Sequence, residues 1–263
     1  MRGVQTEIRK MQPLARYVHC VSHRLNLALM NACKVPLVRN LMGTVQSICK
    51  FFCRSAGRTT ILEQFIVKEC NDTTAKRLKP MCHTRCVERH DTVLVFFDLL
   101  PAIIPALQHI KDESIVAETS SNANSLLISI ARFDFIICLA ARVLFFGITL
   151  PLSKMLQIVN MELAEAYSLV ASTTKSINGV RGEYKAHVCD VAVQLAHNIN
   201  VEVTTPRVVG RQVHRANIPA STPEEHYGLN MFLPFVDAMV TELNGRFPES
   251  HPALLIPSKR PAI

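Results

Sequence analysis

The spacing of apolar residues predicts helices along almost the whole chain. Apolar positions recur three or four residues apart, which is the period of an amphipathic helix. The segments with this pattern are 24–34, 36–53, 58–68, 152–176 and 231–247. Another helix runs from Asp91 toward His109, and because it contains Pro101 and Pro105 we expect it to be kinked or split. The sequence therefore predicts a mainly α protein.

One short segment departs from this pattern. Tyr17 to Cys20 is a run of aromatic and β-branched residues that follows Pro13, and such a run predicts a strand. The next apolar residues, from Leu25 onward, have helical spacing. Cys20 and His23 are thus expected where a strand leads into a helix.

The most apolar window, Leu126 to Leu152, is long enough to span a bilayer. Three charged residues lie inside it, and each would cost about 2.5 to 3.5 kcal/mol at the bilayer centre. These residues are Arg132, Asp134 and Arg142. We therefore expect a buried core helix, preceded by a polar cap region at Ser120 to Asn124 and interrupted at Pro151, and no membrane partner.

Positive charge is concentrated at the start of the chain. The net charge is +8, and residues 1–60 hold ten Lys and Arg against the single acid Glu7. Such a surface attracts phosphates, although a solvated helix face has the same composition. The candidate nucleic-acid contacts are Arg24, Arg39, Lys50, Arg54 and Arg58, together with Arg207, Arg211 and Arg215 in a later Gly-containing loop.

The nine cysteines are scattered and odd in number, in a chain too long to need disulfides for stability. The first twelve residues are charged and lack the apolar stretch of a signal peptide. We therefore expect free thiols in an intracellular, reducing compartment.

Three motifs resemble those of a known family. The first is Cys20-x-x-His23-x-Leu25-Asn26-Leu27, the second is the run Thr84 to Asp91, and the third is Pro206 to Asn217. Together they resemble the hAT-superfamily DNA transposases and the host proteins derived from them. Within that superfamily the closest resemblance is to the group of proteins similar to the 52 kDa repressor of the inhibitor of the protein kinase and to MYM-type zinc finger protein 1.

The resemblance implies a fold and a location. It implies that residues 1–55 are a remnant of a ribonuclease-H-like α/β core and that residues 56–263 are a large all-helical insertion domain. It also implies a nuclear protein. The family motif positions are Cys20, His23, Asn26, Arg85 and Arg89.

The catalytic residues of the family have no counterparts here. Family members hold two metal ions with three acids, two of them before the position of Cys20, where this chain has only Glu7. The third acid belongs to a Ser-Glu-Arg motif that is absent after Arg215, and Cys86 stands where the family has Trp. We expect a catalytically inactive scaffold that binds proteins or, weakly, nucleic acid. The alternative is a piece of a longer, active transposase whose acids lie outside this chain.

Other chemistry is less well supported by the spacing. A structural zinc site needs four ligands, so Cys20 and His23 would need help from Cys49 and Cys53 or from the Cys82 to Cys86 segment. A Cys/His hydrolase normally draws its pair from distant parts of the sequence. Arg85 and Arg89 can contact phosphate or pair with neighbouring acids. We expect no metal, cofactor or small-molecule substrate.

Overall fold

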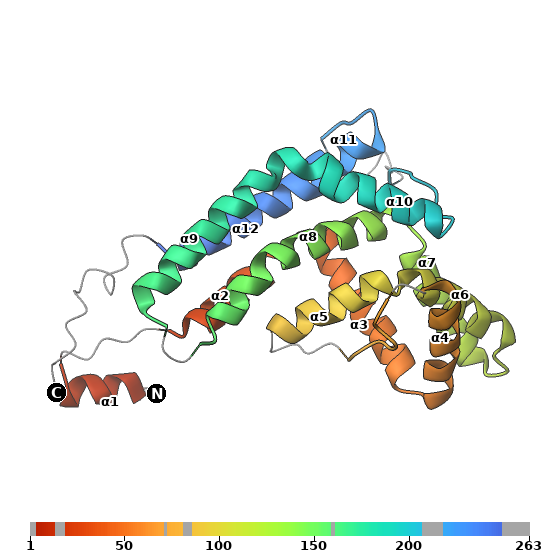
Figure 1. The fold of residues 1–263 in the computed structure, drawn as a ribbon, viewed down its shortest axis with the longest axis horizontal. Helices are drawn as coiled ribbons and strands as arrows, with labels where there is room; N and C mark the ends of the chain where they lie inside the picture. The colour runs from red at the N-terminus through yellow and green to blue at the C-terminus, as the bar shows by residue number, and fades with distance from the viewer. Residues whose placement is uncertain are drawn as a thin grey trace.

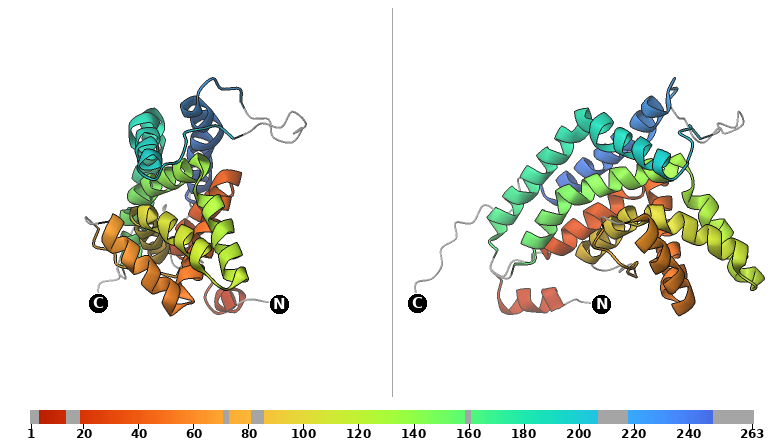
Figure 2. Two further views of the ribbon diagram at one scale, coloured as in Figure 1. Left: turned by 90° about the vertical axis from the view of Figure 1, so that its right-hand side faces the viewer. Right: turned by 45° about the vertical axis from the view of Figure 1, so that its right-hand side comes forward.

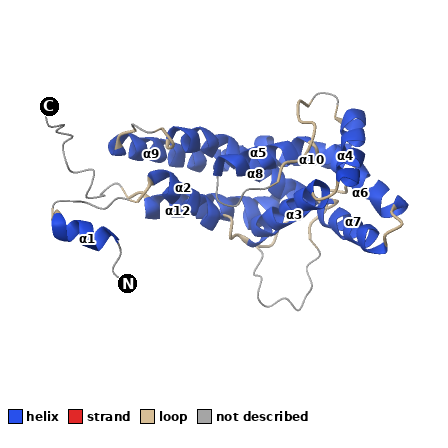
Figure 3. Ribbon diagram, turned by 90° about the horizontal axis from the view of Figure 1, so that it is seen from below, coloured by secondary structure: helices blue, strands red, loops and turns tan. Residues whose placement is uncertain are grey.

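The computed structural model describes residues 4–13, 19–70, 73–80, 86–158, 161–206 and 218–248. Within these ranges every regular element is a helix and there is no strand (Figure 3). The predicted mainly α fold is confirmed. Of the expected strand at Tyr17 to Cys20, residues 17 and 18 lie outside the described residues, and His19 and Cys20 are not in a strand. The ribonuclease-H-like remnant stays a prediction.

The described residues form fifteen helical elements. In chain order they are α1 (Val4–Met11), α2 (Val21–Ala32), α3 (Pro36–Cys53), α4 (Ala56–Glu69), α5 (Cys86–Asp98), α6 (Leu100–Glu113), α7 (Ala117–Ile130), α8 (Phe133–Met155), α9 (Leu163–Gly179), η1 (Val180–Glu183), η2 (Lys185–Cys189), α10 (Asp190–Asn198), α11 (Pro223–Tyr227), η3 (Gly228–Phe232) and α12 (Leu233–Arg246). The segment η1 is a 3-10 helix, whereas η2 and η3 are π-helices.

Helix α8 runs through the middle of the molecule (Figure 1). It packs against α3, α5, α9 and α10, which explains why its sequence is apolar on all sides. Its length and composition would allow it to cross a membrane, but 67% of its most apolar window is buried inside the protein. The expectation of a core helix is confirmed by this burial.

Helices α4, α6 and α7 gather at one end of the molecule, where α6 packs against both of the others (Figures 1 and 2). The expected break between Asp91 and His109 is present, because the axes of α5 and α6 differ by 72°. The chain turns at Leu99, and Pro101 lies in the first turn of α6, where its missing N–H breaks no helical hydrogen bond.

At the other end, α12 packs against α2 and α9, so the first and last parts of the chain lie side by side. The apolar faces of α2, α3, α8, α9 and α12 all contribute to one hydrophobic core. The proposed division at residue 55 stays a prediction. Helix α1 lies apart from the other helices, and its described side chains are exposed (Figures 1 and 3).

Three expectations about the middle of the chain were wrong. Ser120 to Asn124 is not a cap region but lies inside α7, where Ser120 Oγ donates a hydrogen bond to the Lys111 carbonyl of α6. The apolar window is divided at Ala131–Arg132, before α8 begins. Pro151 does not end α8, because it and Gly147 lie on the exposed face, where solvent can reach the carbonyl that loses its partner.

A small polar cluster lies inside the core between α5 and α8. His90 Nε2 is 3.1 Å from the hydroxyl of Thr149, and the His90 ring lies 3.8 Å from the Phe146 ring, centroid to centroid. The Cζ atom of Arg142 is also 3.8 Å from the Phe146 centroid. Aromatic contact thus accompanies the burial of a guanidinium group, which would be costly in a purely aliphatic core.

Candidate nucleic-acid interface

Helix α3 presents a row of basic side chains. Pro36 at its first position favours helix initiation, and the residues that pack into the core lie on one face, with Val38, Leu41 and Val45 in its first half. Arg39, Lys50 and Arg54 are therefore left exposed. From Arg39 to Arg54 the helix rises roughly 22 Å, the length of several phosphates along a nucleic-acid strand.

A loop extends this row beyond the end of α3. The Cys53 thiol donates a weak hydrogen bond of 3.5 Å to the carbonyl of Leu78, which brings Lys76, Arg77 and Lys79 to the helix end. Burial raises the pKa of Cys53, while the nearby positive charge of Arg77 acts in the opposite direction. The loop cations are exposed. Sequence reasoning missed them, although the run Lys76-Arg77-Leu78-Lys79 carries the signal.

We call the six side chains Arg39, Lys50, Arg54, Lys76, Arg77 and Lys79 the basic surface. In the part of the chain that the structure describes, none of them forms an ion pair. No described acid therefore neutralises their charges. A surface of this kind binds phosphates without reading base sequence.

Two other predicted contacts, Arg24 and Arg58, have partners inside the fold. Arg24 donates a 2.6 Å hydrogen bond to the hydroxyl of Tyr167, and its Cζ atom lies 4.8 Å from the Phe247 ring centroid. Arg58 Nε donates a 2.7 Å hydrogen bond to the carbonyl of Phe51, and its Cζ atom is 4.4 Å from that ring. Both side chains fix helix contacts, and any phosphate contact by them stays a prediction.

The motif residues of α2 lie mostly at the surface. Cys20 precedes the helix and, like His23, is exposed, whereas Asn26 is half-buried and its Oδ1 has no hydrogen-bond partner among the described atoms. Arg85 lies outside the described residues, and Arg89 lies within α5 without a described side chain. The other predicted contacts that fall outside the described residues are Arg207, Arg211 and Arg215.

The metal alternatives find no site in the described ranges. No group of three or more His, Cys, Asp and Glu side chains there is arranged to hold an ion. Cys49 is buried in the core, and its burial raises the pKa of the thiol to about 12. The side chains of Cys82, His83 and Cys86 are not among the described ones.

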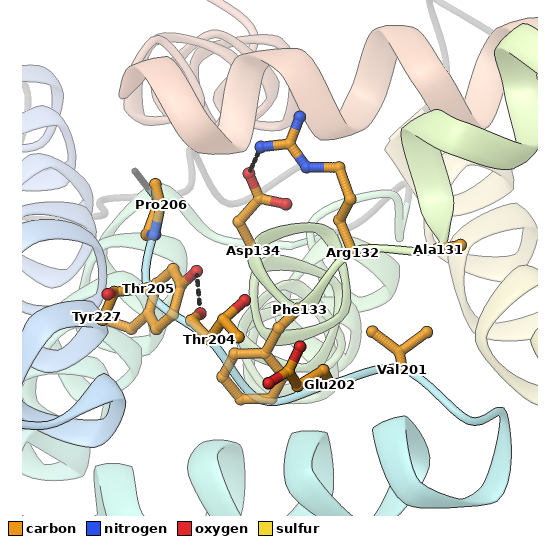
Figure 4. Close-up of a pocket in the computed structure, with 10 residues that line it drawn as sticks. All are labelled: Ala131, Arg132, Phe133, Asp134, Val201, Glu202, Thr204, Thr205, Pro206 and Tyr227. Carbon is orange, nitrogen blue, oxygen red and sulfur yellow. Dashed lines mark hydrogen bonds and ion pairs between the residues drawn. The ribbon is translucent and has the colours of Figure 1, made fainter. Parts of the chain in front are cut away.

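A small pocket lies at the start of α8, beside the extended segment 201–206 (Figure 4). Its volume is about 230 Å³. Arg132 and Asp134 form an ion pair at its edge, and the Tyr227 hydroxyl donates a 3.1 Å hydrogen bond to the Thr204 carbonyl. Burial, reinforced by the Asp134 charge, raises the pKa of Tyr227. With Glu202 also present, the pocket has no excess of positive charge and does not extend the basic surface.

These features define a helical domain with an unneutralised basic surface and, within the described residues, no assembled metal or catalytic centre. The chain is a distant homologue of the 52 kDa repressor of the inhibitor of the protein kinase. It is 25% identical to the human protein of that name over 260 residues and 26% identical to the mouse protein over 265 residues.

Each alignment covers 95% of this chain but only 34% of the relative, so the chain spans about a third of the length of these proteins. No protein-family model matches the sequence, and no solved structure matches it. The two relatives belong to the group of proteins that the motifs led us to expect. Their similarity to this chain does not show the wider relation to hAT transposases.

Proposed function

We propose that this chain is a non-catalytic, transposase-derived scaffold that binds nucleic-acid backbones through the basic surface in the nucleus. The observation that carries the proposal is the set of six exposed cations on α3 and the 73–80 loop, which no described acid neutralises. Each phosphate that they neutralise would release condensed counterions, a favourable contribution to binding.

Three further observations support a scaffold. The relatives are named as repressors, and a repressor acts by binding other molecules. The resemblance of the three motifs to those of hAT transposases, a family that handles DNA, supports the proposal. In this segment the acids that would hold catalytic metals are missing from the corresponding positions, so we propose that the chain alone cleaves no DNA.

A second candidate is a segment of a longer protein with catalytic acids outside this chain. The alignment favours a longer context, because the relatives extend well beyond the matched third. One simple observation distinguishes the two candidate functions. Genomic sequence on both sides of this segment that encodes the family aspartates and the Ser-Glu-Arg motif would support the transposase.

The binding proposal is tested with a fluorescently labelled duplex of random sequence and the variant Lys50→Glu/Arg54→Glu. We expect the variant to lose at least about tenfold in affinity, since two attractive contacts become repulsive. Lys154→Glu/Lys175→Glu, at exposed positions of α8 and α9 outside the basic surface, is the control with the same change of charge, and it should bind more tightly than the variant. Equal losses in both variants would show that only the net charge matters.

A further inference from the structure

A groove is lined by residues of η1, α11, η3 and the start of α12, together with Tyr184. Helix α11 lies at the end of the molecule away from α1 (Figure 1). The volume of the groove is about 440 Å³, within the range of binding pockets. We call it the α11 groove; it is lined mainly by Tyr184, Glu224, Glu225, Leu229, Phe232 and Leu233.

The groove has an apolar floor that is specifically built. The Tyr184 and Phe232 rings lie 4.9 Å apart, and the Tyr184 hydroxyl donates a 3.2 Å hydrogen bond to the Glu224 carbonyl. Gly228 makes room for this ring, because a Cβ there would lie 3.1 Å from Tyr184 Cε1. Leu229 and Leu233 are only half-buried. The two π-helices next to the floor, η2 and η3, are of a kind that occurs frequently at functional sites.

The rim of the groove is acidic. Arg181 is paired with Asp237, and Lys185 Nζ lies 3.6 Å from the carboxylate of Glu224. Glu225 accepts a hydrogen bond from the Ser221 amide but has no basic partner in the described part of the chain. Among the described residues at the rim, two bases therefore face three acids, which leaves a charge of −1 there on a protein whose net charge is +8. The rim favours a positively charged occupant.

Helix α1 has the complementary properties. Val4, Ile8 and Met11 repeat at helical spacing and are 76%, 48% and 85% exposed, so no described part of the chain covers this apolar stripe. In the last turn of α1, Arg9 is exposed and has no ion-pair partner among the described residues, whereas Lys10 Nζ lies 2.8 Å from Glu7 Oε1. Eight residues of helix are about 12 Å long, which suits a groove of this size.

We propose that α1 of one copy of the protein docks into the α11 groove of a second copy. Ile8 and Met11 then contact the apolar floor, and Arg9 meets the acidic rim. This is the helix-in-groove mode of recognition, in which apolar anchors give affinity and rim charges give orientation. Because the helix and the groove are different surfaces, the contact is head-to-tail. The inference does not depend on the nucleic-acid proposal.

Sedimentation velocity of the full chain from about 1 µM to about 100 µM at low salt tests the contact. We expect concentration-dependent association that Arg9→Glu and Glu224→Lys each weaken by about tenfold. Leu229→Lys should abolish it without unfolding the protein, because Leu229 is not among the described residues that pack on the core. The matched control is Glu165→Lys, which also reverses an acid in the first turn of a helix but lies outside the groove.

The most discriminating test is a mixture of the two charge-reversal variants. Arg9→Glu and Glu224→Lys chains should associate with each other more tightly than either does with itself, since mixing restores attraction between the helix and the groove. A chain that stays monomeric at every concentration would overturn the proposal, as would association that is unchanged by all three variants or weakened equally by Glu165→Lys.

Discussion

The guanidinium of Arg24 donates a 2.6 Å hydrogen bond to the hydroxyl of Tyr167, a residue 143 positions later in the sequence. Arg24 belongs to α2 and Tyr167 to α9, and the Phe247 ring beyond α12 covers the same guanidinium. The contact fixes the start of the chain to its last helices. A residue predicted to face phosphate is thus part of the framework that holds the fold together.

Replacing Arg24 with Ala should lower the free energy of unfolding by about 1 to 3 kcal/mol, because a charge-assisted hydrogen bond and a cation–π contact are lost. Tyr167→Phe removes only the hydrogen bond and should cost less. Urea denaturation followed by circular dichroism measures both. If Arg24→Ala were as stable as the wild type but bound DNA much more weakly, the structural role assigned here would be wrong.

Gly228→Ala should be less favourable than Gly245→Ala by about 1 to 3 kcal/mol, because only at Gly228 would the added methyl group crowd a ring, that of Tyr184. The measurement is again the denaturation midpoint. In a Tyr184→Leu background the same substitution should cost less, since the smaller side chain leaves space. Gly245→Ala is a suitable control, because nothing lies within 4 Å of a Cβ at that position.

Cysteine reactivity should follow burial. Burial raises the pKa of Cys49 to about 12 and also raises the pKa of Cys138, so at pH 8 both remain protonated thiols and react slowly. Cys20 is exposed and should be alkylated first. Mass spectrometry of the native protein after brief treatment with iodoacetamide identifies the modified sites. Labelling of Cys138 as fast as Cys20 without denaturant would contradict the packing of α8.

The helical class could be predicted because apolar spacing depends on local geometry, and most of the helices lie close to where the periodicity placed them. The errors occurred where solvent exposure decides the outcome. Pro151 was expected to end a helix, but its lost hydrogen bond faces water on the exposed side of α8. Neither that exposure nor the break at Ala131–Arg132 can be derived from the spacing of apolar residues.

The candidate site could be predicted only in part. The basic row of α3 follows from helical spacing, since Arg39, Lys50 and Arg54 fall opposite the apolar positions. The aromatic partner of Arg58, Phe51, is close to it in the sequence. The aromatic partners of Arg24 could not be foreseen, because Tyr167 and Phe247 reach it only through tertiary packing. The loop cations join the surface through the contact between Cys53 and Leu78, which is also tertiary.

The salt dependence of duplex DNA binding by the wild-type chain tests the central claim most directly. If the basic surface neutralises about three phosphates or more, the logarithm of the affinity should fall with the logarithm of the salt concentration with a slope of about −3 or steeper. Lys50→Glu/Arg54→Glu should reduce the size of that slope. Absence of binding at low salt, or an affinity that stays constant between about 50 mM and about 200 mM salt, would contradict the account.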